Sequence, residues 1–238
     1  MRPIACFLIM AAITAAGAAA ETSSRMLGNR SVVLEEIYYE DFEGGLDDWL
    51  PEGSAAVSLN RGWLEVDGAG GEGGYTTIWC RTPFEGPQLV EYDVRLMSRS
   101  MESNVNMFLL AGNPDVEGLL ATTASRDGSY GQYHEFPNYL ITILNGTSPE
   151  KREQLRLRMR LDPGFELVEE GWFEPLTFGR VHHVAYLLEP PKVSVYLDNR
   201  LLGSAVYGKT YTRGLHGLRI WRTHSIYDNF RVSRIVEH

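Results

Sequence analysis

Residues 215–232, LHGLRIWRTHSIYDNFRV, indicate the fold of this chain more directly than any other stretch. Their pattern predicts two short strands, Gly217–Arg222 and Tyr227–Val232, on either side of a polar bend that carries His224. Apolar and polar residues alternate along the second strand, which is typical of a strand with one side on a core. The alternation places Asp228, Phe230 and Val232 on one face and Tyr227, Asn229 and Arg231 on the other.

Upstream of these strands, the chain consists of short apolar runs separated by Gly, Pro, Asn and Asp. In one example, KVSVYL and RLLGSAVY flank Asp198 and Asn199, a pair suited to the positive backbone angles of a tight hairpin. Only Leu46–Trp49 and Asp115–Leu120 have the character of single helical turns. Many short strands with frequent turns predict an all-β fold, an antiparallel β-sandwich in a single domain over residues 37–238.

The first twenty residues are predicted to be a signal peptide. Arg2 supplies the positive charge, Ile4–Ala16 the apolar segment and Ala18–Ala20 the small residues of a cleavage site. The apolar run is too short to span a bilayer, so we expect no membrane anchor. Cleavage near Ala20 would export the protein to the periplasm or the extracellular space, and residues 21–36 are expected to form a flexible, polar lead-in.

The composition restricts the class of partner. The formal net charge is −9 and no basic tract is present, which argues against nucleic acid or an anionic membrane as the main partner. Of the two cysteines, Cys6 would leave with the signal peptide. Cys80 then has no disulfide partner within the chain, and we expect a small buried apolar residue rather than a reactive thiol.

The segment LRLRMRL is the most unusual predicted strand, because Arg156, Arg158 and Arg160 share one of its faces. Three guanidinium groups cannot be buried in an apolar core without partners. They could form a cross-strand ladder with acids such as Glu91 and Asp93. They could instead line a groove that binds the carboxylate or sulfate groups of an anionic ligand. The sequence leaves both interpretations open.

The segment YGQYHEFPNY, which begins at Tyr130, concentrates polar and aromatic side chains near the start of a predicted strand. His134 could transfer a proton near neutral pH, with Tyr133 or Tyr139 beside it. The alternative is a loop with a packed tyrosine and a solvated histidine.

Arg219 and Trp221 are expected on one face of their strand, where an indole beside a guanidinium could hold a sugar ring and clamp an anion. The alternative is a tryptophan that covers the sheet edge and an arginine paired with an acid. Trp79 raises the same question in an earlier predicted strand. His182 and His183 are a poor metal pair, because adjacent strand residues point to opposite sides.

Several phrases along the chain resemble the YesU-like bacterial family (DUF1961), whose members are concanavalin A-like domains of unknown function. The phrases are Tyr39–Phe42, Ile78–Arg81, Glu91–Val94, Leu155–Arg158, Asp162–Leu167 and Tyr227–Val232. The resemblance implies a concanavalin A-like jelly roll and a role in polysaccharide use, with pectin-like or other acidic glycans as candidates. Residues 113–127 depart most from the family, and no catalytic residue is carried over.

We therefore hypothesise an exported jelly-roll protein that binds an oligo- or polysaccharide in a groove across one sheet. If it is an enzyme, a lyase-like reaction is favoured, with His134 or Tyr133 as the base and Arg158 neutralising the substrate carboxylate. His224 would assist. The expected substrate-binding residues are Trp79, Glu91, Tyr139, Arg156, Arg219 and Trp221. The alternatives are a non-catalytic lectin-like module and a structural β-sandwich without a sugar site.

A retaining glucanase of this fold is not expected. Such enzymes carry Glu-x-Asp-x-(x)-Glu on one strand, which holds two carboxylates about 5–5.5 Å apart. Glu91 and Asp93 match the first two acids, but the third is missing. No cofactor is predicted. A structural calcium ion is compatible with a jelly roll, because such ions bind backbone oxygens, and Asp41 and Asp228 are candidate ligands.

Overall fold

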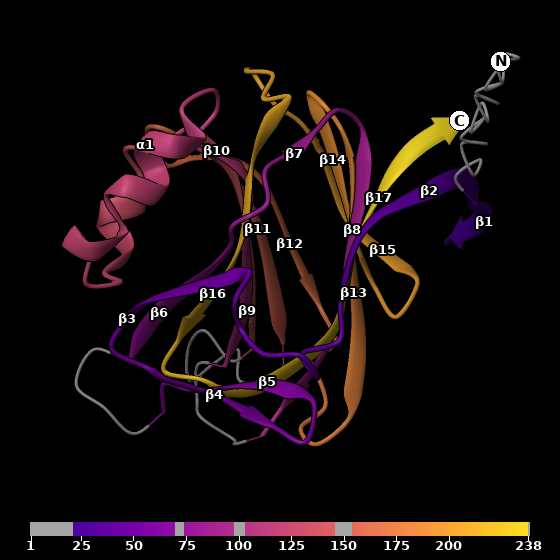
Figure 1. The fold of residues 1–238 in the computed structure, drawn as a ribbon. Coiled ribbons are helices and arrows are strands. Elements are labelled where there is room, and N and C mark those ends of the chain that lie inside the picture. The colour runs from indigo at the N-terminus through magenta and orange to yellow at the C-terminus, as the bar shows by residue number, and fades with distance from the viewer. Residues whose placement is uncertain (1–20, 70–73, 98–102, 146–153, 238) are drawn as a thin grey trace, which may run out of the picture.

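The computed structural model describes residues 21–69, 74–97, 103–145 and 154–237, so the predicted signal peptide lies outside the described residues. Strands dominate this part of the chain and form two antiparallel sheets that face each other (Figure 1). The predicted antiparallel β-sandwich is therefore confirmed. No helix in these ranges has the length and apolar character needed to cross a membrane.

The first sheet contains nine strands among the described residues. They are β1 Thr22–Leu27, β2 Arg30–Glu40, β4 Ala56–Asn60, β5 Trp63–Asp67, β8 Gln88–Leu96, β13 Val181–Glu189, β14 Lys192–Leu197, β15 Arg200–Val206 and β17 His224–Glu237. Their order is β1-β2-β17-β8-β13-β14-β15, with β5 pairing with both β4 and β17.

The second sheet contains eight strands in the same ranges. They are β3 Trp49–Gly53, β6 Tyr75–Cys80, β7 Phe84–Glu85, β9 Asn104–Ala111, β10 Asn138–Asn145, β11 Leu155–Asp162, β12 Glu166–Phe173 and β16 Arg213–Trp221. Their order is β12-β11-β10-β9-β16-β6-β3, and β7 pairs with β16. Between β9 and β10 lie the helix α1 Val116–Ala121 and the 3₁₀ turns η1 Thr123–Ser125 and η2 Tyr130–Tyr133.

The polar bend predicted from the sequence carries the chain from one sheet to the other. β16 ends at Trp221 in the second sheet, and β17 begins at His224 in the first. Both predicted strands are present and are longer than predicted. The hairpin at Asp198 and Asn199 also forms as predicted, because both residues adopt positive φ angles, 49° and 63°.

The core lies between the inner faces of the two sheets. Leu155, Leu157 and Met159 of β11 are fully buried there, while the arginines between them are only partly buried. Phe230 of β17 packs edge-on against Trp49 of β3, with 4.8 Å between the ring centroids, and so joins the two sheets. The period-two pattern of β11 therefore places its arginines on the outer face of the second sheet.

The predicted alternation of the closing strand is interrupted by a β-bulge. Tyr227 and Phe230 are both buried in the core, although they are an odd number of residues apart. The pairing of β17 with β8 shifts between Asp228 and Arg231, and Asn229 has a φ angle of 52°. The extra residue reverses the side to which Tyr227 points, so its predicted position opposite Phe230 is wrong.

Residues 21–36 form strands rather than the predicted flexible lead-in. β1 pairs with β2, and β2 pairs with β17. Leu27, Val32 and Leu34 are buried in a second apolar cluster with side chains of β8 and β13. The sequence predicts a flexible segment here because most of its residues are polar. The burial of these three apolar residues attaches the hairpin to the outer face of the first sheet.

Charged side chains surround this hairpin. Arg25 of β1 contacts Glu91 of β8, with 2.9 Å between Nη2 and Oε1. The ring of His183 in β13 lies between two carboxylates, with Nε2 2.9 Å from Glu91 and Nδ1 2.8 Å from Asp93. Burial opposes the protonation of His183, but the hydrogen bonds to Asp93 and Glu91 outweigh it and raise the pKa of His183 to about 9.

We expect the stability contributed by His183 to fall at alkaline pH. Because the folded-state pKa of about 9 lies above the reference value of about 6.5, the contribution is complete below about pH 6.5 and is lost as the pH rises through about 9. Urea unfolding of the wild type and of His183→Gln across this range measures the effect. The free energy of unfolding should decline with pH more steeply in the wild type, and parallel curves would contradict the prediction.

Candidate functional site

The outer face of the second sheet is divided into a covered half and an open half. Residues 112–137, termed the cover, contain α1, η1 and η2, and Figure 1 shows α1 on the outside of the sandwich. The cover and the sheet beneath it share a buried apolar cluster, whose members are Trp79, Phe108, Ala111, Val116, Leu119, Tyr133, Leu140 and Leu215. In this half, side chains on the outer face of the sheet are therefore buried as well as those that face the core.

A buried ion pair attaches the cover to β3. Arg126 of the cover and Glu52 of β3 lie 3.0 Å apart, from Nη2 to Oε2, and their side chains are 4% and 3% exposed. Arg126 also donates a hydrogen bond to the carbonyl of Leu119, and Glu52 accepts one from Trp79 Nε1 at 2.8 Å. The pair is thus supported by further hydrogen bonds, as buried charges require.

We expect Arg126→Ala to destabilise the protein by about 3–5 kcal/mol, because it leaves the Glu52 carboxylate buried without its cation. Arg213→Ala is the matched control. Its ion pair with Glu117 is longer, at 3.7 Å, and Glu117 is largely exposed, so a loss below about 1 kcal/mol is expected. Urea unfolding measures both variants, and equal losses would contradict the importance of the buried pair.

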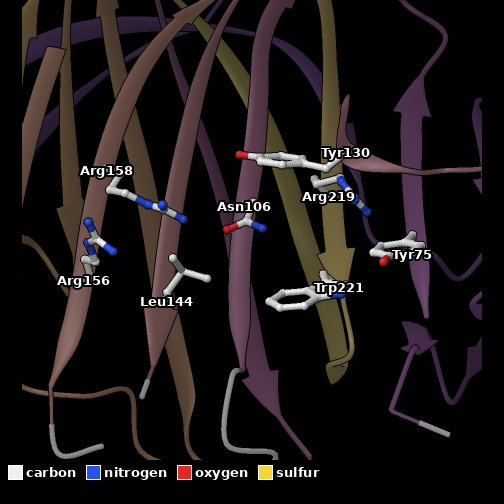
Figure 2. Close-up of a pocket in the computed structure, with 8 residues that line it drawn as sticks. All are labelled: Tyr75, Asn106, Tyr130, Leu144, Arg156, Arg158, Arg219 and Trp221. Carbon is white, nitrogen blue, oxygen red and sulfur yellow. The ribbon is translucent and has the colours of Figure 1, made fainter. Parts of the chain in front are cut away.

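The open half contains a pocket of about 410 Å³ (Figure 2). Figure 2 shows its lining side chains on the adjacent strands β11, β10, β9, β16 and β6. The cover contributes Tyr130, at the border between the two halves. The lining residues that come from the strands are Tyr75, Asn106, Leu144, Arg156, Arg158, Arg219 and Trp221.

Arg219 forms one charged side of this pocket and is only 1% exposed. Its Nη1 donates hydrogen bonds to the carbonyls of Thr76, at 3.1 Å, and Ile220, at 2.6 Å. The guanidinium also lies 5.5 Å from the ring centroid of Tyr75 and 5.4 Å from that of Tyr130. Burial lowers the pKa of Arg219, but a guanidinium keeps its proton in proteins, so a cation lies at the pocket wall.

Arg158 forms the opposite charged side and differs from its neighbours on β11. Arg156 is paired with Glu170, and Arg160 lies over the ring of Phe165, 4.0 Å from its centroid. Within the described residues, Arg158 has no carboxylate at ion-pair distance. Burial, together with repulsion from Arg156 and Arg160, lowers the pKa of Arg158. A bound anion would stabilise the charged form of Arg158 and so offset both the burial and the repulsion.

Apolar surface lies between these cations. Leu144 is buried and Trp221 is half-buried, and both line the pocket. Asn106 stands between them on β9, where its amide nitrogen donates a hydrogen bond to Asn104 at 2.9 Å. A flat indole beside cations and an amide is an arrangement that suits a ligand with both an apolar face and negative charge.

The structure brings together four of the residues selected from the sequence. Arg156 and Arg158 reach the pocket from β11, and Arg219 and Trp221 reach it from β16. The strand order places β10 and β9 between these segments, so residues some sixty positions apart in sequence share one face. Glu91 and Asp93 are not the partners of these arginines, because both acids belong to the first sheet. A cross-strand pair of the expected kind does form, between Arg156 and Glu170 of the neighbouring strand β12.

Sequence reasoning missed four lining residues: Tyr75, Asn106, Tyr130 and Leu144. A signal for one of them was present, because Asn104 and Asn106 are polar residues at alternate positions of an apolar strand. Tyr130 begins the segment YGQYHEFPNY, in which the sequence favours Tyr133 and His134 instead.

Three predicted residues lie under or within the cover instead of lining the pocket. Trp79 is 1% exposed and Tyr133 is fully buried, since both pack in the apolar cluster beneath the cover. The ring of His134 stacks on Phe165, with 3.8 Å between centroids, and contacts Tyr130 edge-on. Burial, aided by the charges of Arg160 and Arg219, lowers the pKa of His134. Burial corrects the predicted surface roles of Trp79 and Tyr133. His134 is half-buried and does not line the pocket.

Three further predicted residues lie elsewhere. His224 begins β17 in the first sheet, where its Nε2 is 2.7 Å from Glu65. Tyr139 points into the core between the sheets and donates a hydrogen bond to the carbonyl of Lys209. Glu91 is bound by Arg25 and His183 on the outer face of the first sheet. None of these three lines the described pocket, so their predicted site roles are corrected.

No group of three or more His, Cys, Asp or Glu side chains in the described ranges is arranged to hold a metal ion. Burial and the charges of Asp93 and Asp41 raise the pKa of Asp228. The structural calcium ion with Asp41 and Asp228 as ligands stays a prediction. Cys80 is buried, which raises the pKa of its thiol to about 11 and confirms the expectation of a small buried residue.

A family model for DUF6250, described as a domain of unknown function, matches residues 71–230. This chain belongs to the DUF6250 family. The matched region includes every strand that lines the pocket, from β6 to β16. A search of curated protein sequences found no match.

The DUF6250 chain shares its fold with several solved structures. A protein of unknown function with a galectin-like fold from Bacillus subtilis is 18% identical, with a TM-score of 0.73 over 86% of this chain and 100% of that one. The carbohydrate-binding module CBM66 from Bacillus subtilis is 14% identical, with a TM-score of 0.54 over 79% and 96%. An endo-β-1,3-glucanase from Pyrococcus furiosus is 11% identical, with a TM-score of 0.61 over 90% and 99%. These likenesses show the fold alone, and they confirm the predicted concanavalin A-like jelly roll.

Proposed function

We propose that this protein binds an acidic oligo- or polysaccharide in the open pocket of the second sheet. The observation that carries the proposal is Arg158, a half-buried guanidinium in the pocket wall without an ion-pair partner among the described residues. A carboxylate or sulfate group on a sugar would supply the counter-charge, and its two oxygens match the planar fork of a guanidinium.

Trp221 supports a sugar as the carrier of that negative charge. Pyranose rings present a face of C–H groups that packs on an indole, while their hydroxyl groups bond to polar neighbours such as Asn106. Trp221 and Asn106 both line the pocket beside the arginines. The fold itself is shared with a protein named as a carbohydrate-binding module and with one named as a glucanase, which makes a glycan ligand consistent with the architecture.

We favour binding over cleavage. His134, Tyr133 and His224, which would move protons in the hypothesised lyase-like reaction, do not line the pocket with Arg158. Among the described lining residues there is also no Asp or Glu, so the geometry lends no support to a paired-acid hydrolase. The lectin-like alternative therefore agrees better with the site than the lyase-like one.

Two parts of the proposal rest on the sequence alone. Export after cleavage near Ala20 would place the pocket where extracellular or periplasmic glycans occur. A relation to the YesU-like family, carried by the phrases described above, would connect the protein with polysaccharide degradation. Both stay predictions.

The proposal is tested first on arrays of acidic and neutral glycans and then by calorimetry with the acidic oligosaccharide that binds best. Arg158→Ala and Trp221→Ala are each expected to weaken binding about fivefold to thirtyfold, because a charged hydrogen bond or a ring contact contributes about 1–2 kcal/mol. Arg95→Ala is the matched control and should leave binding unchanged. Arg95 is a half-buried arginine of the first sheet whose guanidinium stacks over Trp63 at 5.6 Å.

The outcomes separate the alternatives. Binding of neutral glycans with no effect of Arg158→Ala would overturn the acidic ligand, and no glycan binding at all would support the structural alternative. The same mixtures are monitored for the absorbance of unsaturated sugar products. Their formation by the wild type, and loss in Arg158→Ala, would favour the lyase-like alternative over simple binding.

A further inference from the structure

The pocket ends at Arg156 on β11, but the second sheet continues to its edge strand β12. On β12, Trp172 lies directly opposite Arg156 in the antiparallel register and is half-buried. Opposed residues of antiparallel strands share a face, so Trp172 stands on the same outer face as the pocket. The guanidinium of Arg156 lies over its indole, 5.1 Å from the ring centroid. An aromatic ring beside a cation thus occurs a second time, past the border of the pocket.

We propose that Trp172 and Arg156 form a second sugar subsite, and that the protein binds an internal stretch of a linear acidic polysaccharide across the strands. The inference rests on the proposed function, because it extends the same site to a longer ligand. The ligand that the two subsites would bind together is a chain of linked uronate residues rather than a single sugar or a chain end.

The distance between the two tryptophans supports a ligand of several sugars. Trp172 on β12 and Trp221 on β16 stand four strand intervals apart in the order β12-β11-β10-β9-β16. At about 4.8 Å per interval, the span across the sheet is roughly 19 Å, which exceeds the length of one pyranose ring. Arg156 and Arg158 lie on β11, between the strands that carry the two indoles, so a chain that reaches both rings passes its acidic groups over these cations.

The border with the cover directs such a chain across the strands. Tyr130 lines the pocket on this side, and its ring contacts Phe165 edge-on, with 5.4 Å between centroids. Phe165 in turn is packed between His134 and the guanidinium of Arg160, which donates a hydrogen bond to the Phe165 carbonyl. These side chains close the outer face at the end of the pocket next to the cover. A long ligand that avoids this border would cross β16, β9, β10, β11 and β12.

Glu170 holds the second subsite in place. It lies opposite Arg158 in the register and forms an ion pair with Arg156 through Nε and Nη2. The pair fixes the guanidinium of Arg156 over Trp172, so that the aromatic and cationic groups are arranged before a ligand arrives. Such prior ordering lowers the entropic cost of binding.

The test measures affinity against ligand length. Galacturonate and its linear oligomers up to the hexamer, with the mannuronate and glucuronate series beside them, are titrated by calorimetry into the wild type, Trp172→Ala and Trp63→Ala. We expect wild-type affinity to rise about tenfold or more from monomer to hexamer in the series that binds. Trp172→Ala should lose about tenfold for the longer oligomers and keep the monomer affinity, as expected for the loss of one ring contact.

Trp63→Ala is the matched control, because Trp63 makes the same kind of stack with Arg95 on the first sheet. It should bind every length as the wild type does. Trp172→Phe, which keeps an aromatic ring, should retain most of the length dependence and guards against a loss of folding in Trp172→Ala.

Affinity that is independent of length, or equal effects of the Trp172 and Trp63 variants, would overturn the second subsite and leave the proposed function intact. Absence of binding for all three uronate series would also overturn the second subsite as a site for linked uronates, whereas the proposed function is overturned only if sulfated and other acidic glycans fail to bind as well.

Discussion

The contact between the cover and the second sheet determines where this protein can meet a ligand. Without residues 112–137, the whole outer face of that sheet would be a surface on which Trp79, Phe108 and Arg219 stood side by side. The cover makes half of that face interior, and the ion pair between Arg126 and Glu52 attaches it where water is excluded. Movement of the cover away from β3 would separate the two charges and leave each of them buried without a partner. This cost holds the cover in one position on the sheet.

The arginines of the open half show how the protein maintains a positive pocket on an acidic surface. The withdrawal of a guanidinium from water is unfavourable, and Arg219 offsets this with two backbone carbonyls and the faces of neighbouring tyrosines. Arg158 lacks an ion-pair partner among the described residues, so an anionic ligand is the group that would complete its surroundings. Because these groups are ordered by packing, little side-chain entropy remains to be lost on binding.

The two sheets use their outer faces differently. On the first sheet, the hairpin of β1 and β2 occupies the face, and Glu91 is engaged by Arg25 and His183. A site that used Glu91 would have to displace this hairpin. On the second sheet, the strands β16, β9, β10 and β11 leave a stretch between the cover and the edge strand, and the pocket lies there.

The amino-acid sequence by itself determined the antiparallel strands, the hairpin at Asp198 and Asn199, and the common face of Arg156, Arg158 and Arg160. Each follows from backbone geometry over a few residues, since alternate side chains of a strand must share a side. The sequence could not reveal the bulge that turns Tyr227 inward, nor the burial of Trp79, Tyr133 and Tyr139. The tertiary structure alone decided which faces stay open, because that depends on segments distant in sequence, the N-terminal hairpin and the cover, folding back onto the sheets.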